Sequence, residues 1–320
     1  MRLLGWLQQH FWLPMCLALV MGVVLPGIGN DLKPTLIPVL VVILTTVFSK
    51  IDLKEVFHHL SNPRLMAGLL VLKLVIVPLV FYGLVNLVEP HYAVGVLLLL
   101  AMPPGASTPV FTDLVKGNTA LCVSVYALSY FAAPFTITGL MALTGQPDLP
   151  LGKLFSYIGT LIFLPLALSQ ILRRFTPKVV EKTSPYYGGM NLLLITWLIF
   201  VMVSAMVGDF QNQAGEEGAV TLTRMIAMGA AMYLLFLALH LIGYYSVFKR
   251  READRLAVSV TMTYMNTAFC LVVAGKFFGP EAVLVAVLSE LPWSTMLGPF
   301  GWLHRKVLAP TFSGAEQSVP

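Results

Sequence analysis

Apolar side chains run along this chain in stretches about as long as a bilayer is thick, separated by short polar or charged turns. A helix needs roughly 20 mostly apolar residues to cross the hydrocarbon core, so each stretch is a candidate membrane span. The pattern therefore predicts an all-α membrane protein of about ten transmembrane helices, with spans at 9–27, 35–49, 66–88, 93–115, 119–143, 153–172, 190–208, 225–247, 256–277 and 282–303.

The composition agrees with this prediction. Of the 320 residues, 58% are hydrophobic and 11% are charged, and the mean hydropathy is +0.83, whereas soluble domains average about 25% charged residues. No long polar stretch marks a second domain, so residues 1–306 are predicted to form a single transmembrane domain, followed by a disordered tail at 307–320. The first apolar stretch lacks a small-residue cleavage site and is interpreted as a span, not a signal peptide.

Lysine and arginine residues fall mostly into alternate loops. Short cytoplasmic loops are enriched in these residues, so we place both termini in the cytoplasm, and the bias explains the basic excess without nucleic acid. No organelle signal is visible, and we expect a bacterial inner membrane. The outer side then receives only Lys33, Lys153, Arg224 and Lys276.

The fourth stretch cannot be one continuous helix. Prolines and a glycine at 103–105 interrupt it, because proline removes an amide donor and clashes with the preceding turn. We expect a half-helix that ends at Met102, an extended crossing, and a second half-helix. Thr108 is predicted as the N-cap of this second half, with Pro109 as its first helical residue.

The ninth stretch has a polar middle without proline. Thr261, Thr263, Asn266 and Thr267 lie within it, and Asn266 or Thr267 is expected to cap a second half-helix there. The two interruptions fall fourth and ninth of ten, the same place in two halves of five. Paired broken helices at equivalent places are typical of inverted repeats in secondary transporters, here about 1–145 and 146–306.

With these residues in view, the chain resembles the bile acid:sodium symporter family over nearly its whole length. The resemblance rests on MPPGASTPVFTDLVKGNTALCVSV (102–125), on MNTAF (265–269), and on the amphipathic loop KIDLKEVFHHLSNPRL (50–65) before a span with Pro78. It implies ten helices in a panel domain and a core domain. It also implies an elevator-like or rocking exchange that carries small organic anions.

The residues at the family's sodium-site positions depart from its pattern. The resemblance aligns its ninth-helix glutamate and glutamine with Thr261 and Met265, its fourth-helix asparagine with Pro109, its fifth-helix hydroxyl residues with Cys122 and Tyr126, and its third-helix glutamine with Lys73. Sodium prefers hard oxygen ligands, whereas methionine and cysteine supply soft sulfur. We therefore predict that both sodium sites are absent and that Lys73 replaces one ion as a tethered cation, which could also titrate and couple transport to protons.

The ends of the half-helices are the predicted substrate site. Exposed amides and the positive end of a helix dipole favour anions, and a nearby lysine favours a carboxylate or a sulfonate. The candidate substrate-binding residues are Gly105, Ser107, Thr108, Asn266 and Thr267. The alternative, that the breaks only shape the fold, is left open.

Other polar residues in or near the spans have two interpretations each. Lys73 is a buried cation or a side chain that snorkels to the interface. Glu290 is a functional carboxylate that pairs with Lys73 or relays a proton, or a buried hydrogen-bonded or protonated acid. Asp113 is expected to be an interfacial charge and His240 a satisfied core residue. His58 and His59 are assigned to the cytoplasmic loop without a binding role.

The function predicted from the sequence is a secondary active transporter of small organic anions, independent of sodium and either proton-coupled or exchanging. The alternatives are a sodium-coupled symporter and an arsenite efflux carrier of a related family, which relies on a cysteine where this chain has Met102 and Ala106. A channel would show a continuous polar face. The sequence lacks HExxH, GxSxG and paired carboxylates at catalytic spacing, so it predicts no enzyme. No cofactor or metal site is expected, and the partners are the substrate and the bilayer.

Overall fold

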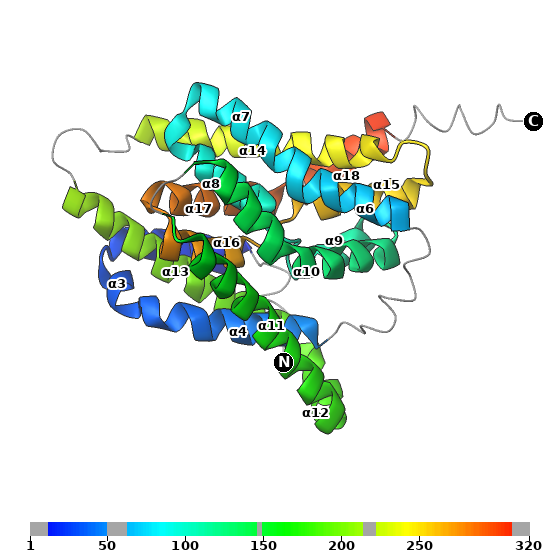
Figure 1. The fold of residues 1–320 in the computed structure, drawn as a ribbon, viewed down its shortest axis with the longest axis horizontal. Helices are drawn as coiled ribbons and strands as arrows, with labels where there is room; N and C mark the ends of the chain where they lie inside the picture. The colour runs from blue at the N-terminus through cyan, green and yellow to red at the C-terminus, as the bar shows by residue number, and fades with distance from the viewer. Residues whose placement is uncertain (1–11, 50–62, 146–148, 214–221, 309–320) are drawn as a thin grey trace, which may run out of the picture.

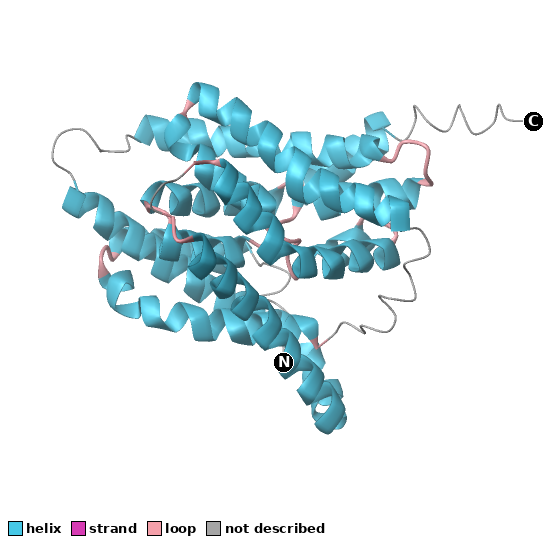
Figure 2. Ribbon diagram, in the orientation of Figure 1, coloured by secondary structure: helices cyan, strands magenta, loops and turns pink. Residues whose placement is uncertain are grey.

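The computed structural model describes residues 12–49, 63–145, 149–213 and 222–308, and these are almost entirely helical (Figure 2). Within these ranges, extended pairing is confined to one antiparallel bridge between Pro104 and Met265. The prediction of an all-α membrane protein is confirmed in its helical content.

The helices follow one another with short connections (Figure 1). They are α2 (Trp12–Val24), α3 (Ile28–Leu32), α4 (Leu36–Phe48), α6 (Pro63–Val71), α7 (Val77–Val88), α8 (Pro90–Ala101), α9 (Thr108–Leu114), α10 (Thr119–Leu143), α11 (Leu151–Phe175), α12 (Pro177–Thr183), α13 (Tyr187–Gln213), α14 (Leu222–Ser246), α15 (Glu252–Thr263), α16 (Thr267–Phe277), α17 (Pro280–Thr295) and α18 (Leu297–Leu303). Short 3₁₀ turns are η1 (Lys33–Thr35) and η3 (Ser184–Tyr186), and π-helical turns are η2 (Leu72–Ile76) and η4 (His304–Leu308).

Six helical segments of the described residues are long and apolar enough to cross a membrane: Ile28–Phe48, Pro63–Val88, Thr119–Leu143, Leu151–Phe175, Pro177–Asp209 and Ile226–Ser246. A seventh is obtained if Pro280–Thr295 and Leu297–Leu308 form one span bent by 51°. The predicted tenth segment is therefore not one straight helix. The first, fourth and ninth predicted segments contain only shorter apolar helices, Leu13–Val24, Pro90–Ala101 and Thr267–Phe277.

Parts of the sequence predictions lie outside the described residues. These are residues 9–11 of the first predicted span, the loop that carries His58 and His59, and residues 309–320 of the predicted tail. The first two residues of that tail, Val307 and Leu308, belong to η4, and Leu308 is buried. Two residues assigned to the tail are therefore helical.

The helices pack in two groups. In the first, α13 packs along α2, α3 and α4, and α11 packs on α4 (Figure 1). In the second, α14 packs against α15 and α17, α7 against α8, and α10 against α8, α9 and α15. Contacts of α13 with α16 and α17, of α4 with α16, and of α10 with α11 join the groups.

The broken segments are the most deeply buried part of the molecule. Every described side chain of α16 from Thr267 to Ala274 is buried, and α8 is buried from Gly95 to Ala101. A helix that is apolar all round belongs in the interior of a protein or a membrane. Here neighbouring helices cover both half-helices, so the interruptions lie inside the protein and not against lipid.

A close backbone contact joins α3 to α13 in the first group. The Gly29 amide donates to the Ser204 hydroxyl at 2.9 Å. A Cβ atom at Gly29 would lie 2.1 Å from the Val201 carbonyl oxygen. Only glycine allows this approach, since the obstacle is backbone and not a flexible side chain.

We expect Gly29→Ala to lower the stability of the protein by roughly 1–3 kcal/mol, because the added methyl group forces α3 away from α13. The matched control is Gly68→Ala in α6, where a Cβ atom meets nothing within 4 Å and alanine favours the helix by up to about 1 kcal/mol. Unfolding temperatures of both purified variants check this. Equal behaviour of the two variants would contradict the close packing.

Candidate functional site

Two interrupted helix pairs, α8–α9 and α15–α16, cross inside the second group. Their breaks bind each other through the backbone: the Gly105 amide donates to the Tyr264 carbonyl at 2.8 Å, and the Asn266 amide donates to the Pro103 carbonyl at 2.8 Å. The sequence predicted both interruptions, and the structure confirms them. It also brings them into direct contact, and we refer to this contact as the crossing.

The residue types of the first break explain its shape. Met102 leaves the helix with an extended backbone at ψ 143°, as expected for a residue that precedes proline. Pro103 and Pro104 carry no amide hydrogen, so only their carbonyls take part in pairing. A Cβ atom at Gly105 would lie 3.0 Å from the Met265 carbonyl oxygen, so glycine is what lets the two backbones approach.

Asn266 holds the second break. Its side-chain oxygen accepts from the Phe269 amide at 2.9 Å, which caps α16. Its side-chain amide donates to the Tyr130 hydroxyl at 2.7 Å, and this hydroxyl donates to the Pro104 carbonyl at 3.1 Å. Of the two predicted capping residues, Asn266 or Thr267, the structure selects Asn266, and this side chain also ties both breaks to α10.

The prediction for Thr108 is wrong by one residue. Helix α9 begins at Thr108, so Ser107 is the N-cap, without a side-chain capping bond, and Pro109 is the second helical residue. The Thr108 hydroxyl donates to the Gly105 carbonyl at 2.7 Å and lies 3.1 Å from the Tyr264 carbonyl. The hydroxyl has one hydrogen, which lies within reach of both carbonyls, and Thr108 therefore connects the two breaks.

The five predicted substrate-binding residues thus lie in the breaks or at the first residues of the following half-helices. Most are buried and use their polar groups to hold the backbone together, whereas Ser107 is half-buried. They are Gly105, Ser107, Thr108, Asn266 and Thr267.

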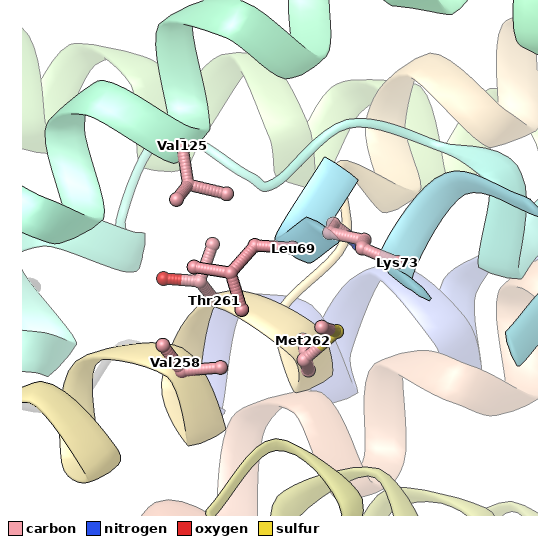
Figure 3. A pocket seen from close by; sticks show the side chains of 6 residues that line it. All are labelled: Leu69, Lys73, Val125, Val258, Thr261 and Met262. Carbon is pink, nitrogen blue, oxygen red and sulfur yellow. The ribbon is translucent and has the colours of Figure 1, made fainter. Parts of the chain in front are cut away.

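Lys73 lies in the π-helical turn η2, with 2% of its surface exposed. Among the described residues, no atom accepts a hydrogen bond from its ammonium group. The structure therefore supports a buried cation and not a snorkelling side chain. It lines a narrow pocket whose other walls come from α6, α10 and α15 (Figure 3), namely Leu69, Val125, Val258, Thr261 and Met262.

Thr261 and Cys122, two of the aligned sodium-site positions, lie side by side near this pocket. The Cys122 thiol interacts with the hydroxyls of Thr261 and Thr112. The Thr261 hydroxyl already donates to the Ala257 carbonyl at 2.6 Å. This part of the site offers sulfur and committed hydroxyls, which are poor ligands for sodium.

The two other aligned positions on the ninth segment and on α10 are equally buried. Met265 is fully buried in the crossing, and its carbonyl accepts from the Trp293 indole at 3.3 Å. Tyr126 packs its ring on Tyr130 with centroids 4.9 Å apart. The Tyr126 hydroxyl interacts with that of Tyr130 and reaches neither break.

Glu290 does not pair with Lys73. The carboxyl is 2% exposed, and neither of its oxygens has a hydrogen-bond partner within the described ranges. It faces α16, where the Thr267 hydroxyl and the Cys270 thiol interact with it. The ion pair considered from the sequence is therefore absent, because the two side chains face different helices.

The remaining polar candidates lie away from the crossing. His240 is buried, with Nδ1 2.9 Å from the Ser259 hydroxyl and its ring stacked on Phe300 at 3.9 Å. Its Nε2 has no hydrogen-bond partner among the described residues, so the predicted core histidine is only half satisfied. Asp113 is exposed at the end of α9. Over the described residues, no three His, Cys, Asp or Glu side chains gather in a way that could hold a metal ion.

Sequence reasoning missed two residues that hold the crossing, Tyr130 and Trp293. Tyr130 carries the hydroxyl between Pro104 and Asn266, and Trp293 binds the Met265 carbonyl. The available signal for Tyr130 was its spacing from Tyr126, since residues four apart share one face of a helix. For Trp293 the sequence offered only its place after the proline of α17.

The amino-acid sequence also matches a family of known proteins. Residues 37–213 match the Sodium Bile acid symporter family. A Bacillus subtilis protein named as an uncharacterized sodium-dependent transporter (YocS) is 25% identical over 292 residues, which is 90% of this chain and 82% of the relative. The probable sodium/metabolite cotransporter BASS1 of Arabidopsis thaliana chloroplasts is 24% identical over 88% of this chain and 69% of its own length. Sodium/bile acid cotransporter 7 of Danio rerio is 24% identical over 43% of this chain and 40% of its own length.

We expect Tyr130→Phe to destabilise the protein by roughly 1–3 kcal/mol, because it leaves buried polar groups of Pro104 and Asn266 without their partner. Tyr126→Phe is the control: the same atom is removed one helical turn away, where the hydroxyl interacts with Tyr130 but is not bonded to either break. Thermal unfolding of the two variants measures the difference. A Tyr126→Phe loss as large as that of Tyr130→Phe would show that the hydroxyl does not fasten the crossing.

Proposed function

The chain belongs to the sodium bile acid symporter family, and from this premise we propose that it carries small organic anions without binding sodium. Family membership and the membrane-spanning helices make it an integral membrane transporter and not an enzyme. The names of the relatives specify sodium, bile acids or metabolites for those proteins. The residues of this chain depart from a sodium site, and the proposal rests on that departure.

The single observation that carries the proposal is the buried ammonium of Lys73, at a position that the resemblance assigns to a sodium ligand. Two unit charges about 4 Å apart repel by about 4 kcal/mol at an effective dielectric constant of about 20. That is roughly a thousandfold loss in affinity for a cation beside Lys73. The lysine therefore excludes sodium from its own surroundings and supplies the positive charge itself.

The neighbouring ligands point the same way. Cys122 and Met265 contribute sulfur side chains, and the Thr261 hydroxyl is bound to a backbone carbonyl. Among the described residues of the Lys73 pocket, no carboxylate is available. A sodium ion at this place would lack the hard oxygen ligands that it prefers.

A buried cation without a counter-charge favours an anionic ligand. Charges inside a membrane protein are costly unless they are paired or face a water-filled cavity. We propose that a carboxylate or sulfonate of the substrate neutralises Lys73 when the pocket opens. The substrate would bind along the crossing, where the N-terminus of α16 adds the positive end of a helix dipole. The residues proposed to line its path are Gly105, Ser107, Thr108, Asn266 and Thr267.

The architecture proposed for this transport is ten helices in two inverted repeats, about 1–145 and 146–306. It is supported by the equivalent places of the two breaks and by their mutual pairing. The two packing groups would move against each other by an elevator-like or rocking exchange. The distribution of lysine and arginine supports cytoplasmic termini, and the membrane proposed is a bacterial inner membrane.

The first test is the unfolding temperature of the purified protein in sodium, potassium and choline at equal ionic strength. Sodium bound at a hundred times its dissociation constant would stabilise the folded state by about 2.7 kcal/mol. We expect no difference between the three cations. A shift specific to sodium would return the protein to sodium-coupled symport and end the proposal.

The second test is Lys73→Met, which keeps the length of the side chain and removes the charge. We expect equal or higher stability, because a buried unpaired charge disappears, together with loss of organic-anion uptake into proteoliposomes. Lys276→Met, at an exposed position near the end of α16, is the matched control and should keep uptake. Unchanged uptake by Lys73→Met would contradict the role of the lysine.

A further inference from the structure

The inference concerns Glu290, the buried carboxyl on α17. Its exposed fraction is 2%, and both oxygens lack a hydrogen-bond partner among the described residues. Isolated buried carboxylates are rare, because removal of a full charge from water costs several kcal/mol unless a partner compensates it. The geometry therefore requires something that neutralises this group.

No described cation faces Glu290. Helix α17 packs against α8, α13, α14, α16 and α18, and of these α16 directs the Thr267 hydroxyl and the Cys270 thiol toward the carboxyl. Charged or titratable groups on the other packed elements are exposed or bound to other residues. On α8 and α13, His91 is exposed and Asp209 pairs with Lys33. On α14, His240 contacts Ser259 and Tyr233 contacts Thr295, and after α18 His304 contacts Glu252.

We propose that Glu290 is a proton-binding site next to the crossing and that its proton travels with the anionic substrate. A proton taken from water forms an O–H bond on one carboxylate oxygen and is returned to water when the site opens on the other side. The neutral carboxyl has one O–H donor, and the Thr267 hydroxyl oxygen can accept from it. The thiol of Cys270 completes a small polar lining.

Coupling to the substrate follows because the Glu290 carboxyl, on α17, faces the first residue of α16. Thr267 is the first residue of that half-helix, where the dipole attracts negative charge. An ionised Glu290 competes there with an anionic substrate, whereas a protonated Glu290 leaves the helix end to the substrate. Anion binding and proton binding therefore favour each other. This coupling rests on the proposed transport of organic anions, whereas proton binding itself does not.

A direct contact connects Glu290 to the crossing. Trp293 follows Glu290 on α17 by less than one helical turn, and its indole nitrogen donates to the Met265 carbonyl at 3.3 Å. Met265 is in turn paired with Pro104 of the other break. A displacement of α17 when the carboxyl gains or loses its proton is thus passed to both broken segments.

The test is infrared spectroscopy of the purified full-length protein over a range of pH, in potassium and in sodium. We compare the wild type, Glu290→Gln and the control Glu281→Gln, which makes the same change at the partly exposed start of α17. We expect a protonated-carboxyl C=O band at neutral pH in the wild type and in Glu281→Gln, and its loss in Glu290→Gln. Glu290→Gln should fold, because glutamine resembles the protonated acid in shape.

Thermal unfolding of the same variants provides a second readout. Unfolding exposes Glu290 to water and releases its proton. Wild-type stability should therefore fall as the pH rises from the ordinary titration range of a carboxyl to the pH at which the folded protein loses the proton, and should level off above it; Glu290→Gln should lose that part of the slope. No protonated band at neutral pH, or an unchanged slope in Glu290→Gln, overturns the proposal. Disappearance of the band on addition of sodium at constant pH also overturns it, since the site would then take sodium.

The outcomes separate this proposal from the transport proposal. Sodium stabilisation that persists in Glu290→Gln contradicts sodium-independent transport and leaves proton binding at Glu290 intact. For coupling, we measure organic-anion uptake into proteoliposomes with and without an inward proton gradient. A gradient should accelerate uptake by the wild type and by Glu281→Gln but not by Glu290→Gln. Equal acceleration in all three overturns the coupling role.

Discussion

The structure depends on one constraint: the backbone groups freed by two helix breaks must find partners inside the protein. Within a membrane there is no bulk water to accept them, and each unsatisfied group costs several kcal/mol. Here each break satisfies the other through the Gly105–Tyr264 and Asn266–Pro103 bonds. Neither break is stable without the other, so two segments far apart in sequence are held at one point. This fixed point is what positions the side chains around it.

The crossing also determines how two buried ionisable groups relate to each other. Lys73 faces the end of α15 beside Thr261, and Glu290 faces the start of α16 beside Thr267. The break in the ninth segment lies between these two neighbourhoods, so the groups do not neutralise each other directly. Each needs a separate partner, and the natural partners differ in sign. An anion for Lys73 and a proton for Glu290 would leave the loaded carrier nearly neutral at both places, which lowers the cost of moving it through the membrane.

The sequence predicted the parts of this arrangement that depend on local chemistry. Proline and glycine after Met102 left no choice but an interrupted helix, and an asparagine in a polar segment is a strong capping signal. The features that the sequence did not predict depend on tertiary contacts. In the sequence Tyr130 is one aromatic residue among many, and only the fold brings its hydroxyl to Pro104 and Asn266. The predicted N-cap of α9 was wrong by one residue, since Ser107 holds that position. The Thr108 hydroxyl instead contacts the Tyr264 carbonyl of another segment. Six or seven segments of the described residues are long enough to be spans, against the ten predicted. The half-helices of the two broken segments are individually too short to be counted.

The place of Lys73 follows from a proline five residues later. Pro78 has no amide hydrogen, so the Leu74 carbonyl loses its normal partner in the helix. The helix adopts the π-helical turn η2 at this place, in which the Val77 amide donates to the Leu72 carbonyl five residues earlier. Such single turns within helices are frequent at functional sites. Here the turn carries the lysine, which is buried among α6, α10 and α15. Because Pro78 by itself accounts for the widened turn, the charge at position 73 is not needed to form it. The proposed replacement of a bound ion by Lys73 therefore requires no special backbone of its own.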